Sequence, residues 1–206
     1  MPGGRRVDPA LESHDTVSGA DWYGREIPGE SYDGVVFEDL DMAEARSRGT
    51  AFSNCTFRRA RFNASVHDGS AFVNCTFAGC TFYDARFTDC KLVGSTFDRC
   101  TFDLLQVAGG NWSLVSLRSA HLATASFRGV LLREADLAGA SFHTSRLRDC
   151  DLAGAALRQA DFRGCDLRGS DLSALDPAHA DIRGAIITIA QTLVIAENLG
   201  LDVREE

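Results

Sequence analysis

Cysteine is the residue type in this 206-residue sequence with the most chemical potential. Seven cysteines could bind a metal ion or take part in redox chemistry, since thiolates are metal ligands and nucleophiles. Their positions argue against both uses, because every number is a multiple of five: Cys55, Cys75, Cys80, Cys90, Cys100, Cys150 and Cys165. Such spacing indicates a structural repeat in which the thiols act as small apolar side chains.

Histidine, the commonest general base, shows no arrangement that would support catalysis. The five residues are His14, His67, His121, His143 and His179, and they fall at different positions of the repeat described below. No Ser-His-Asp or Cys-His arrangement emerges from them. No Gly-rich phosphate-binding loop appears in the sequence. We therefore predict a protein that is not an enzyme and has no metal or cofactor.

A period of five residues organises most of the chain. Of the 34 positions from Trp22 to Ile187 whose numbers end in 2 or 7, 31 are apolar, and all thirteen phenylalanines fall on this phase. Only Ser47, His67 and Pro177 depart from it. A helix would repeat its apolar residues every three or four positions and a strand every two, so neither explains the pattern.

A square coil accounts for this period. If five residues form one side and one corner, four such units close a turn of twenty residues, with the Leu or Phe and the small residue two places earlier both pointing inward. We predict an all-β fold, a quadrilateral β-helix of about eight coils. Cys55 with Cys75, and Cys80 with Cys100, then become neighbours within disulfide reach, although reduced thiols packed in a core are the simpler expectation.

The segment ASFHTSRLRDCDLAGAALRQADFRGCDLRGSDL, residues 140–172, resembles the pentapeptide-repeat family, whose consensus is A-(D/N)-L-x-x. The resemblance covers about residues 20 to 187 and implies a right-handed solenoid. An uninterrupted stack followed by a short apolar C-terminal element is similar to the quinolone-resistance, topoisomerase-protecting members. That similarity implies a dimeric, acidic rod that mimics duplex DNA and binds DNA gyrase.

Three segments are expected from the pattern: a flexible N-terminal tail over 1–19, the repeat solenoid over 20–187, and a capping or dimerisation helix with a tail over 188–206. The helix is predicted over 188–199, ending before Gly200. Its apolar residues exceed what one capping face needs, which is typical of a protein contact. We predict a homodimer, although all of these residues could instead pack on the last coil. The predicted interface residues are Ile189, Leu193, Val194, Ile195 and Leu199.

One column of the coil breaks the apolar rule. Ser47, His67, Phe87 and Val107 lie twenty residues apart and should stack on one side. Two adjacent polar core residues suggest a bulge or wetted patch. The segment 104–112, with Gly109 and Gly110, suggests a structural seam between a Phe-rich and a Leu-rich half. A binding notch at His67 is the functional alternative.

Any function must then lie on the outer sides, where acidic residues precede the core position. The candidate partner-binding residues are Asp136, Asp151, Asp161, Asp166, Asp171 and Asp181. Asp151 should stack under Asp171, and Asp161 under Asp181, to form acidic ladders. The alternative is that these residues reflect only the Asp/Asn preference of the repeat on a soluble surface.

The overall charge limits the possible partners. A net charge of −8 argues against direct nucleic-acid binding. The first fifteen residues contain no signal-peptide core, and no run reaches the length of a membrane span, so a cytoplasmic protein is expected. Two functions remain open: a DNA-mimicking modulator or protector of gyrase, and a generic interaction scaffold for another partner.

Overall fold

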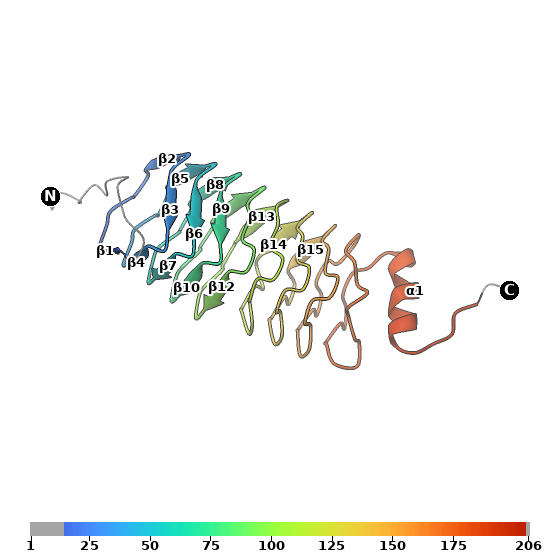
Figure 1. Cartoon of the computed structure of the whole chain (residues 1–206). Helices are drawn as coiled ribbons and strands as arrows, with labels where there is room; N and C mark the ends of the chain where they lie inside the picture. The colour runs from blue at the N-terminus through green and yellow to red at the C-terminus, as the bar shows by residue number, and fades with distance from the viewer. Residues whose placement is uncertain (1–14, 205–206) are drawn as a thin grey trace.

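A twenty-residue offset governs the pairing between neighbouring strands. Each strand pairs in parallel with the one twenty residues later, from Thr16↔Val36 to Arg128↔Arg148. Isolated bridges keep this offset as far as Asp166↔Ile186. The chain, a computed structural model that describes residues 15–204, therefore winds into a rod-shaped parallel β-solenoid (Figure 1). This confirms the fold class predicted from the period of five.

The stacked strands form three sheets, and each sheet makes one side of the coil. The first sheet contains β1 (Thr16–Ser18), β4 (Val36–Glu38), β7 (Thr56–Arg58), β10 (Thr76–Ala78) and β12 (Thr96–Asp98). The second contains β2 (Glu26–Pro28), β5 (Arg46–Arg48), β8 (Val66–Asp68), β11 (Arg86–Thr88), β13 (Gln106–Ala108), β14 (Ser126–Arg128) and β15 (Arg146–Arg148). The third contains β3 (Ser31–Asp33), β6 (Ala51–Ser53) and β9 (Ala71–Val73). Bridges such as Asp21↔Asp41 and Asp161↔Asp181 make the fourth side.

The interior is filled by columns of side chains that repeat every turn. In the N-terminal part the rings stack face to face, with centroids 5.1 Å apart for Phe37–Phe57, 5.0 Å for Phe57–Phe77 and 4.6 Å for Phe77–Phe97. We call residues 16–108 the lower turns and residues 111–187 the upper turns. In the upper turns the same interior columns hold mainly leucine.

The corners of the coil require left-handed backbone. Sixteen non-glycine residues have positive φ, and every one has a number ending in 4 or 9, two places after a core residue. Within the described coils of the solenoid, Gly110 is the one residue with positive φ, 84°, whose number does not end in 4 or 9. It stands at a position that small residues occupy in the other units. A Cβ atom there would lie 2.2 Å from the Cys90 carbonyl oxygen, so only glycine fits. This close approach marks the boundary between the lower and upper turns.

The cysteines point inward, as predicted, and they also donate hydrogen bonds. All seven are free thiols. Five of them bond to the carbonyl oxygen of the core residue 23 positions earlier at 3.4–3.5 Å: Cys55, Cys75, Cys80, Cys90 and Cys100. Ser95 makes the equivalent contact to Phe72 at 2.7 Å. The small site therefore favours a side chain that is compact and also able to donate.

His67 is a fully buried core residue, and its ring lies against Phe87 with centroids 4.6 Å apart. Its Nδ1 lies 2.7 Å from Ser47 Oγ and its Nε2 2.9 Å from Ser65 Oγ. Ser65 Oγ donates to the Phe62 carbonyl, so it accepts from Nε2–H, and Nδ1 of the neutral ring then accepts from the Ser47 hydroxyl. Burial lowers the pKa of His67 to about 3. The predicted notch or wetted patch does not open here, because serines satisfy both ring nitrogens inside the core.

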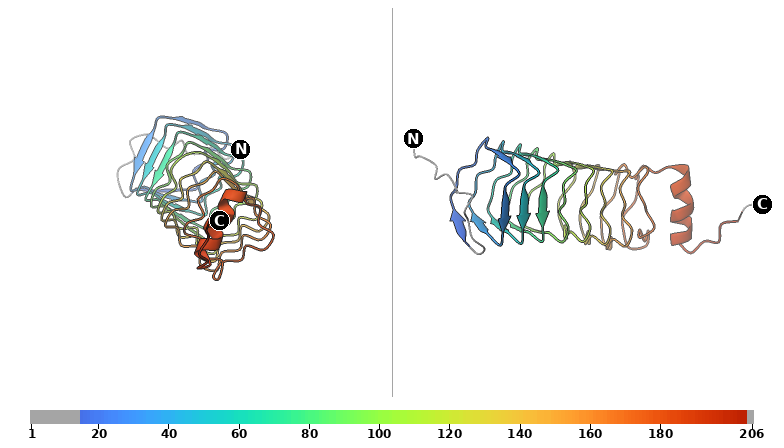
Figure 2. Two further views of the ribbon diagram at one scale, coloured as in Figure 1. Left: turned by 90° about the vertical axis from the view of Figure 1, so that its right-hand side faces the viewer. Right: turned by 45° about the horizontal axis from the view of Figure 1, so that its top comes forward.

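The C-terminal helix α1 (Ile189–Asn198) lies across the end of the solenoid (Figure 2). Thr188 is its N-cap and forms a capping box with Gln191, while Leu199 is the C-cap. Gln191 Nε2 donates to the carbonyls of Leu167 and Ser170, both at 2.8 Å. Asn198 Nδ2 donates to the carbonyls of the last turn at Leu172 and Leu175. The two amides thus cover carbonyls that no further coil can pair.

The start of the solenoid differs from the predicted segment boundary. The predicted tail of residues 1–19 lies mostly outside the described residues, but β1 already pairs with β4 from Thr16 onward. Val17 occupies the core phase and packs partly buried against the core, which explains the earlier start. Among residues 15–204 there is no helix with the length and apolar character of a membrane span.

Candidate interaction surfaces

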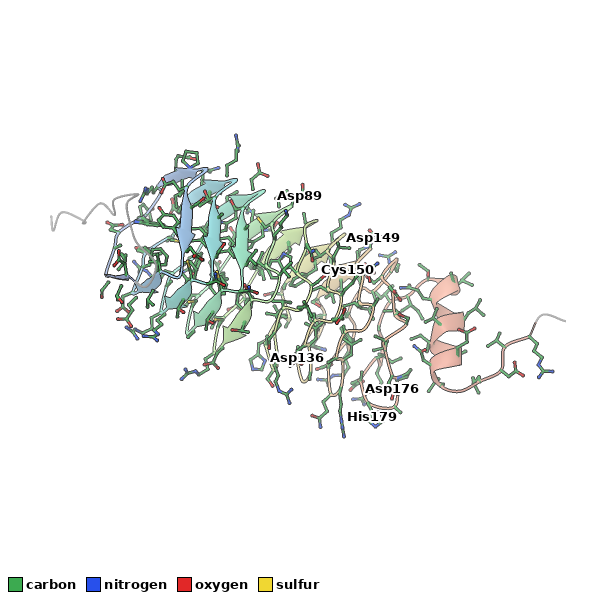
Figure 3. All side chains as sticks on the ribbon, viewed as in Figure 1. Asp89, Asp136, Asp149, Cys150, Asp176 and His179 are labelled. Carbon is green, nitrogen blue, oxygen red and sulfur yellow. The ribbon has the colours of Figure 1, made fainter. Side chains whose placement is uncertain are left out.

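The described residues hold little that could perform chemistry. Within residues 15–204, no group of three or more His, Cys, Asp or Glu side chains could hold a metal ion. The exposed His179 Nδ1 lies 2.6 Å from Asp176 Oδ2 on a loop near the C-terminal end (Figure 3). A hollow beside this pair is lined by Leu157, Arg158 and Ala174, and no serine or cysteine lines it.

The six predicted partner-binding aspartates all stabilise their own turns. Each carboxylate accepts a hydrogen bond from the backbone N–H two residues later, as Asp151 does from Ala153 at 3.1 Å and Asp171 from Ser173 at 2.8 Å. The others are Asp136, Asp161, Asp166 and Asp181. Asn111 makes the same bond to Ser113 at 2.9 Å. The Asp/Asn preference of the repeat thus has a local structural cause, the capping of a turn.

The structure stacks these aspartates as the spacing predicts, with bridges Asp151↔Asp171 and Asp161↔Asp181. It also places an arginine against nearly every one. Arg163 donates two hydrogen bonds to the Asp161 carboxylate, and Arg183 donates two to the Asp181 carboxylate. The remaining ion pairs are Arg163 with Asp181, Arg168 and Arg148 with Asp166, Arg133 with Asp151, and Arg118 with Asp136. Within the described residues, Asp171 alone of the six has no ion pair.

The arginines also shift the acidity of these carboxylates. Hydrogen bonds from Arg183 lower the pKa of Asp181 to about 2. Arg163 and Arg168 lower the pKa values of Asp161 and Asp166 in the same way. Asp161, Asp166 and Asp181 therefore stay ionised, but their charge is balanced locally by arginine. The predicted acidic ladders are present as stacked aspartates, but they carry little net charge because arginines pair with most of them. Sequence position alone did not reveal these arginine partners.

The five residues of the predicted dimer interface divide between two faces of α1. Val194 and Ile195 are partly buried against the solenoid core, so they contribute to the cap. Ile189, Leu193 and Leu199 are exposed, with 92%, 53% and 55% of their surface accessible. Sequence analysis missed Gln191 and Asn198 as capping residues, because an amide in a helix has no signal until its carbonyl partners are placed.

Comparisons with known proteins identify the repeat. A model described as a pentapeptide repeat region matches residues 80–157. A model for eight copies of the pentapeptide repeat matches residues 150–188, so the two together span more than half of the chain. The chain belongs to the pentapeptide-repeat family. The match begins at residue 80, so it leaves out most of the lower turns, where phenylalanine replaces the leucine of the consensus.

Solved structures support the same fold. Two trypsin-treated variants of QnrB1, a plasmid-mediated fluoroquinolone resistance protein, each align with a TM-score of 0.71 at 20% sequence identity. The alignments cover 93% and 94% of this pentapeptide-repeat protein and 99% of each QnrB1 chain. At this identity the likeness describes the fold. No curated protein sequence matches the chain significantly.

Proposed function

We propose that this pentapeptide-repeat protein is a DNA-mimicking binding protein that interacts with DNA gyrase and either modulates it or protects it from quinolone-like poisons. The observation that carries the proposal is the solenoid itself, which aligns along nearly its whole length with a fluoroquinolone resistance protein. A rod of stacked turns with aspartates on its outer sides has the shape and the negative sign that a mimic of duplex DNA needs. This role places the protein in the cytoplasm.

The proposal includes a homodimer joined end to end through α1. The exposed leucine and isoleucine side chains on the outer face of that helix favour it, because unpaired apolar surface at one end of a rod is buried by a two-fold contact. Leu193→Glu should convert the dimer to a monomer in light scattering, since it places a charge in an apolar contact. Thr192→Glu is the matched control, because Thr192 is also exposed on α1 and is not apolar. Equal masses for the two variants would move the interface elsewhere.

A second function is favoured by a specific observation, the pairing of most outer aspartates with arginine. A surface balanced in this way is a weak mimic of the DNA backbone, whose phosphates carry uncompensated charge. It suits a protein scaffold that recognises its partner through local ion pairs and shape. The two proposals differ in how strongly partner binding should depend on the stacked carboxylates.

A gyrase supercoiling assay with and without ciprofloxacin separates the two proposals. Asp151, Asp161, Asp171 and Asp181 changed together to Asn should keep the fold, since Asn111 already caps a turn in this chain. The effect on gyrase should fall sharply in this variant, more at low salt than at high salt. Asp33, Asp68, Asp98 and Asp103 changed to Asn give a control of equal net charge. If the parent protein has no effect on supercoiling or on ciprofloxacin action at low salt, the scaffold proposal replaces the gyrase proposal.

A further inference from the structure

The outer surface of the seven-stranded sheet becomes rich in arginine in its last rows. Arg128 ends β14, Arg146 and Arg148 flank the buried Leu147 in β15, and Arg168 occupies the same column one turn later. We call these four residues the arginine face. In Figure 1 the labels β14 and β15 mark its position along the rod, on the same side as β2 and β5.

The residues of the arginine face repel one another in the free protein. Arg128 and Arg148 are directly paired in the parallel register of β14 and β15. Neighbouring strands lie about 4.8 Å apart, and like charges at opposed positions destabilise a sheet. A third arginine, Arg168, continues the column. Such a stack costs stability unless an anion lies against it.

The chain itself supplies too few carboxylates for these four cations. Asp166 binds Arg168 through two nitrogens at 2.8 Å, and the same carboxylate is the nearest acid to Arg148, at 3.8 Å. Asp149 approaches Arg128 no closer than 3.8 Å. Two acids therefore serve four arginines, and the face keeps a net positive charge on a protein whose total is −8.

Two of the arginines are left with unused hydrogen-bonding groups. Arg146 is exposed and has no ion pair with any carboxylate of residues 15–204. The Arg148 Nε is buried and has no hydrogen-bond partner in that part of the chain. The exposed guanidinium of Arg146, which has no acid of its own, is the group that an incoming carboxylate or phosphate would reach and pair with.

The lower rows of the same sheet show the balanced arrangement. Arg46, Arg48 and Arg86 occupy the same two outer columns. Each lies within 4 Å of a different carboxylate, so three acids serve three arginines: Glu26 at 3.9 Å, Asp68 at 3.5 Å and Asp84 at 3.1 Å. Between the two groups lies β13, whose outer residues are uncharged. The excess of positive charge is therefore specific to the last rows of the sheet.

We propose that the arginine face is a docking site for an acidic segment of a partner protein, a short run of Asp and Glu side chains. Guanidinium groups bind carboxylates with two parallel hydrogen bonds, which suits closely spaced acids. A nucleic acid fits less well, because its binding depends on many phosphate contacts over a broad basic surface, and the total charge of this protein is negative. The inference goes beyond the gyrase proposal and does not depend on it.

Fluorescence anisotropy with a labelled oligoglutamate peptide at low salt tests this site. The triple variant Arg128→Gln, Arg146→Gln, Arg148→Gln should bind the peptide about tenfold more weakly than the parent, since exposed ion pairs each contribute modestly. The matched control is Arg46→Gln, Arg48→Gln, Arg86→Gln, which changes the net charge equally on the same sheet. The control should stay within about twofold of the parent.

Three results would overturn the proposal: equal losses in the two triple variants, no peptide binding by the parent at low salt, or tighter binding of a duplex oligonucleotide than of the peptide. Circular dichroism checks that both variants fold. If the first triple variant does not fold, the single variant Arg146→Gln replaces it, because the Arg146 side chain is exposed and makes no ion pair within the described chain. Its affinity should fall about two- to threefold, and an unchanged affinity would contradict the site.

Discussion

The lower and upper turns of this solenoid share one period but build their sides differently. Thirteen of the fifteen strands, β1 to β13, lie before residue 109, and only β14 and β15 follow. In the upper turns most sides instead close with a hydrogen bond from the N–H three residues after the core residue, as in Ala135 to Leu132 and Ala140 to Leu137. The same five-residue unit can therefore form either an extended side or a turn.

Extended sides and turn sides differ on average in the residue type at their core position. Extended sides are centred mainly on aromatic residues, as in β6, β7, β9 and β10, whereas turn sides in the upper part are centred mainly on leucine. Aromatic residues have a high preference for extended backbone and stack well in parallel register. The period sets the coil, but the core residue alone does not set the backbone of a side, because Phe62, Phe82 and Phe102 centre turn sides within the lower turns.

The two regions also pair their charges differently. In the lower turns ion pairs join neighbouring coils at an offset of twenty, as in Glu38 with Arg58 and Asp39 with Arg59. In the upper turns, pairs between coils such as Arg133 with Asp151 are joined by pairs within a turn, in which an aspartate binds the arginine two residues later, as Asp161 binds Arg163. A turn folds the side chains of positions i and i+2 together, while an extended side leaves them for the next coil. The surface charge pattern thus follows from the type of side beneath it.

The largest effect is expected where the lower turns are most tightly stacked. Phe77 lies between Phe57 and Phe97, so Phe77→Asp would bury an ionised carboxylate among rings. The cost should exceed the several kcal/mol by which such a domain is stable, at about 5 kcal/mol or more, and abolish folding. Circular dichroism should show loss of the β signal. Phe77→Leu should stay folded at a cost of about 1.5 kcal/mol, because Leu137 fills the same column in the upper turns. If Phe77→Asp folds, the stacked phenylalanines of the lower turns do not form the tightly packed core described here.

A smaller effect is expected at the upper end, where the solenoid meets its cap. Gln191→Ala would leave the Ser170 carbonyl without the side-chain donor that replaces a further coil. An unpaired buried carbonyl costs about 2 kcal/mol, so the midpoint of urea unfolding should fall accordingly. The exposed Thr192→Ala is the control and should leave the midpoint almost unchanged. Equal stability of the parent and Gln191→Ala would mean that α1 caps the solenoid only through apolar contacts.

The sequence predicted the coil, its inward-facing cysteines and a helix from Thr188 to Leu199 because each depends on local spacing. It did not predict which sides would be extended, because Phe and Leu satisfy the same apolar rule. Nor did it predict the arginine partners of Asp151 and Asp161, since side-chain pairing depends on corner geometry. His67 stood out in the sequence, but its serine partners come from two different turns and only the three-dimensional packing brings them together.

The pH dependence of stability should report on His67. Its pKa is lowered to about 3 in the folded core, against about 6.5 in the unfolded chain. Protonation therefore favours the unfolded state, and the stability present above pH 6.5 is lost as the pH falls from 6.5 toward 3. At pH 5 the loss should be about 2 kcal/mol. Urea unfolding at pH 7 and pH 5 measures it.

The histidine contribution can be separated from that of the carboxylates. Arginine lowers the pKa of Asp181 to about 2, so its stabilisation is present above the unfolded value near 3.9 and is lost only below it. Between pH 7 and pH 5 such groups contribute little. His67→Phe, which continues the ring column below Phe87, should have nearly equal stability at the two pH values. If that variant keeps the slope of the parent, another group is responsible.

The smallest expected change in stability comes from replacing a cysteine that lies over an extended side, compared with one that lies over a turn side. Cys80 Sγ donates to the Phe57 carbonyl of an extended side at 3.4 Å, whereas the Phe142 carbonyl below Cys165 already accepts from the N–H and the hydroxyl of Ser145. A thiol is a weak donor, so Cys80→Ala should cost about 0.5 kcal/mol, and Cys165→Ala less. Cys80→Ser should restore the stability, because Ser95 makes the same contact to Phe72 at 2.7 Å. Thermal unfolding of the three variants ranks them. If Cys80→Ser is less stable than Cys80→Ala, the small site selects for apolar volume alone, and the donor role of its thiols is wrong.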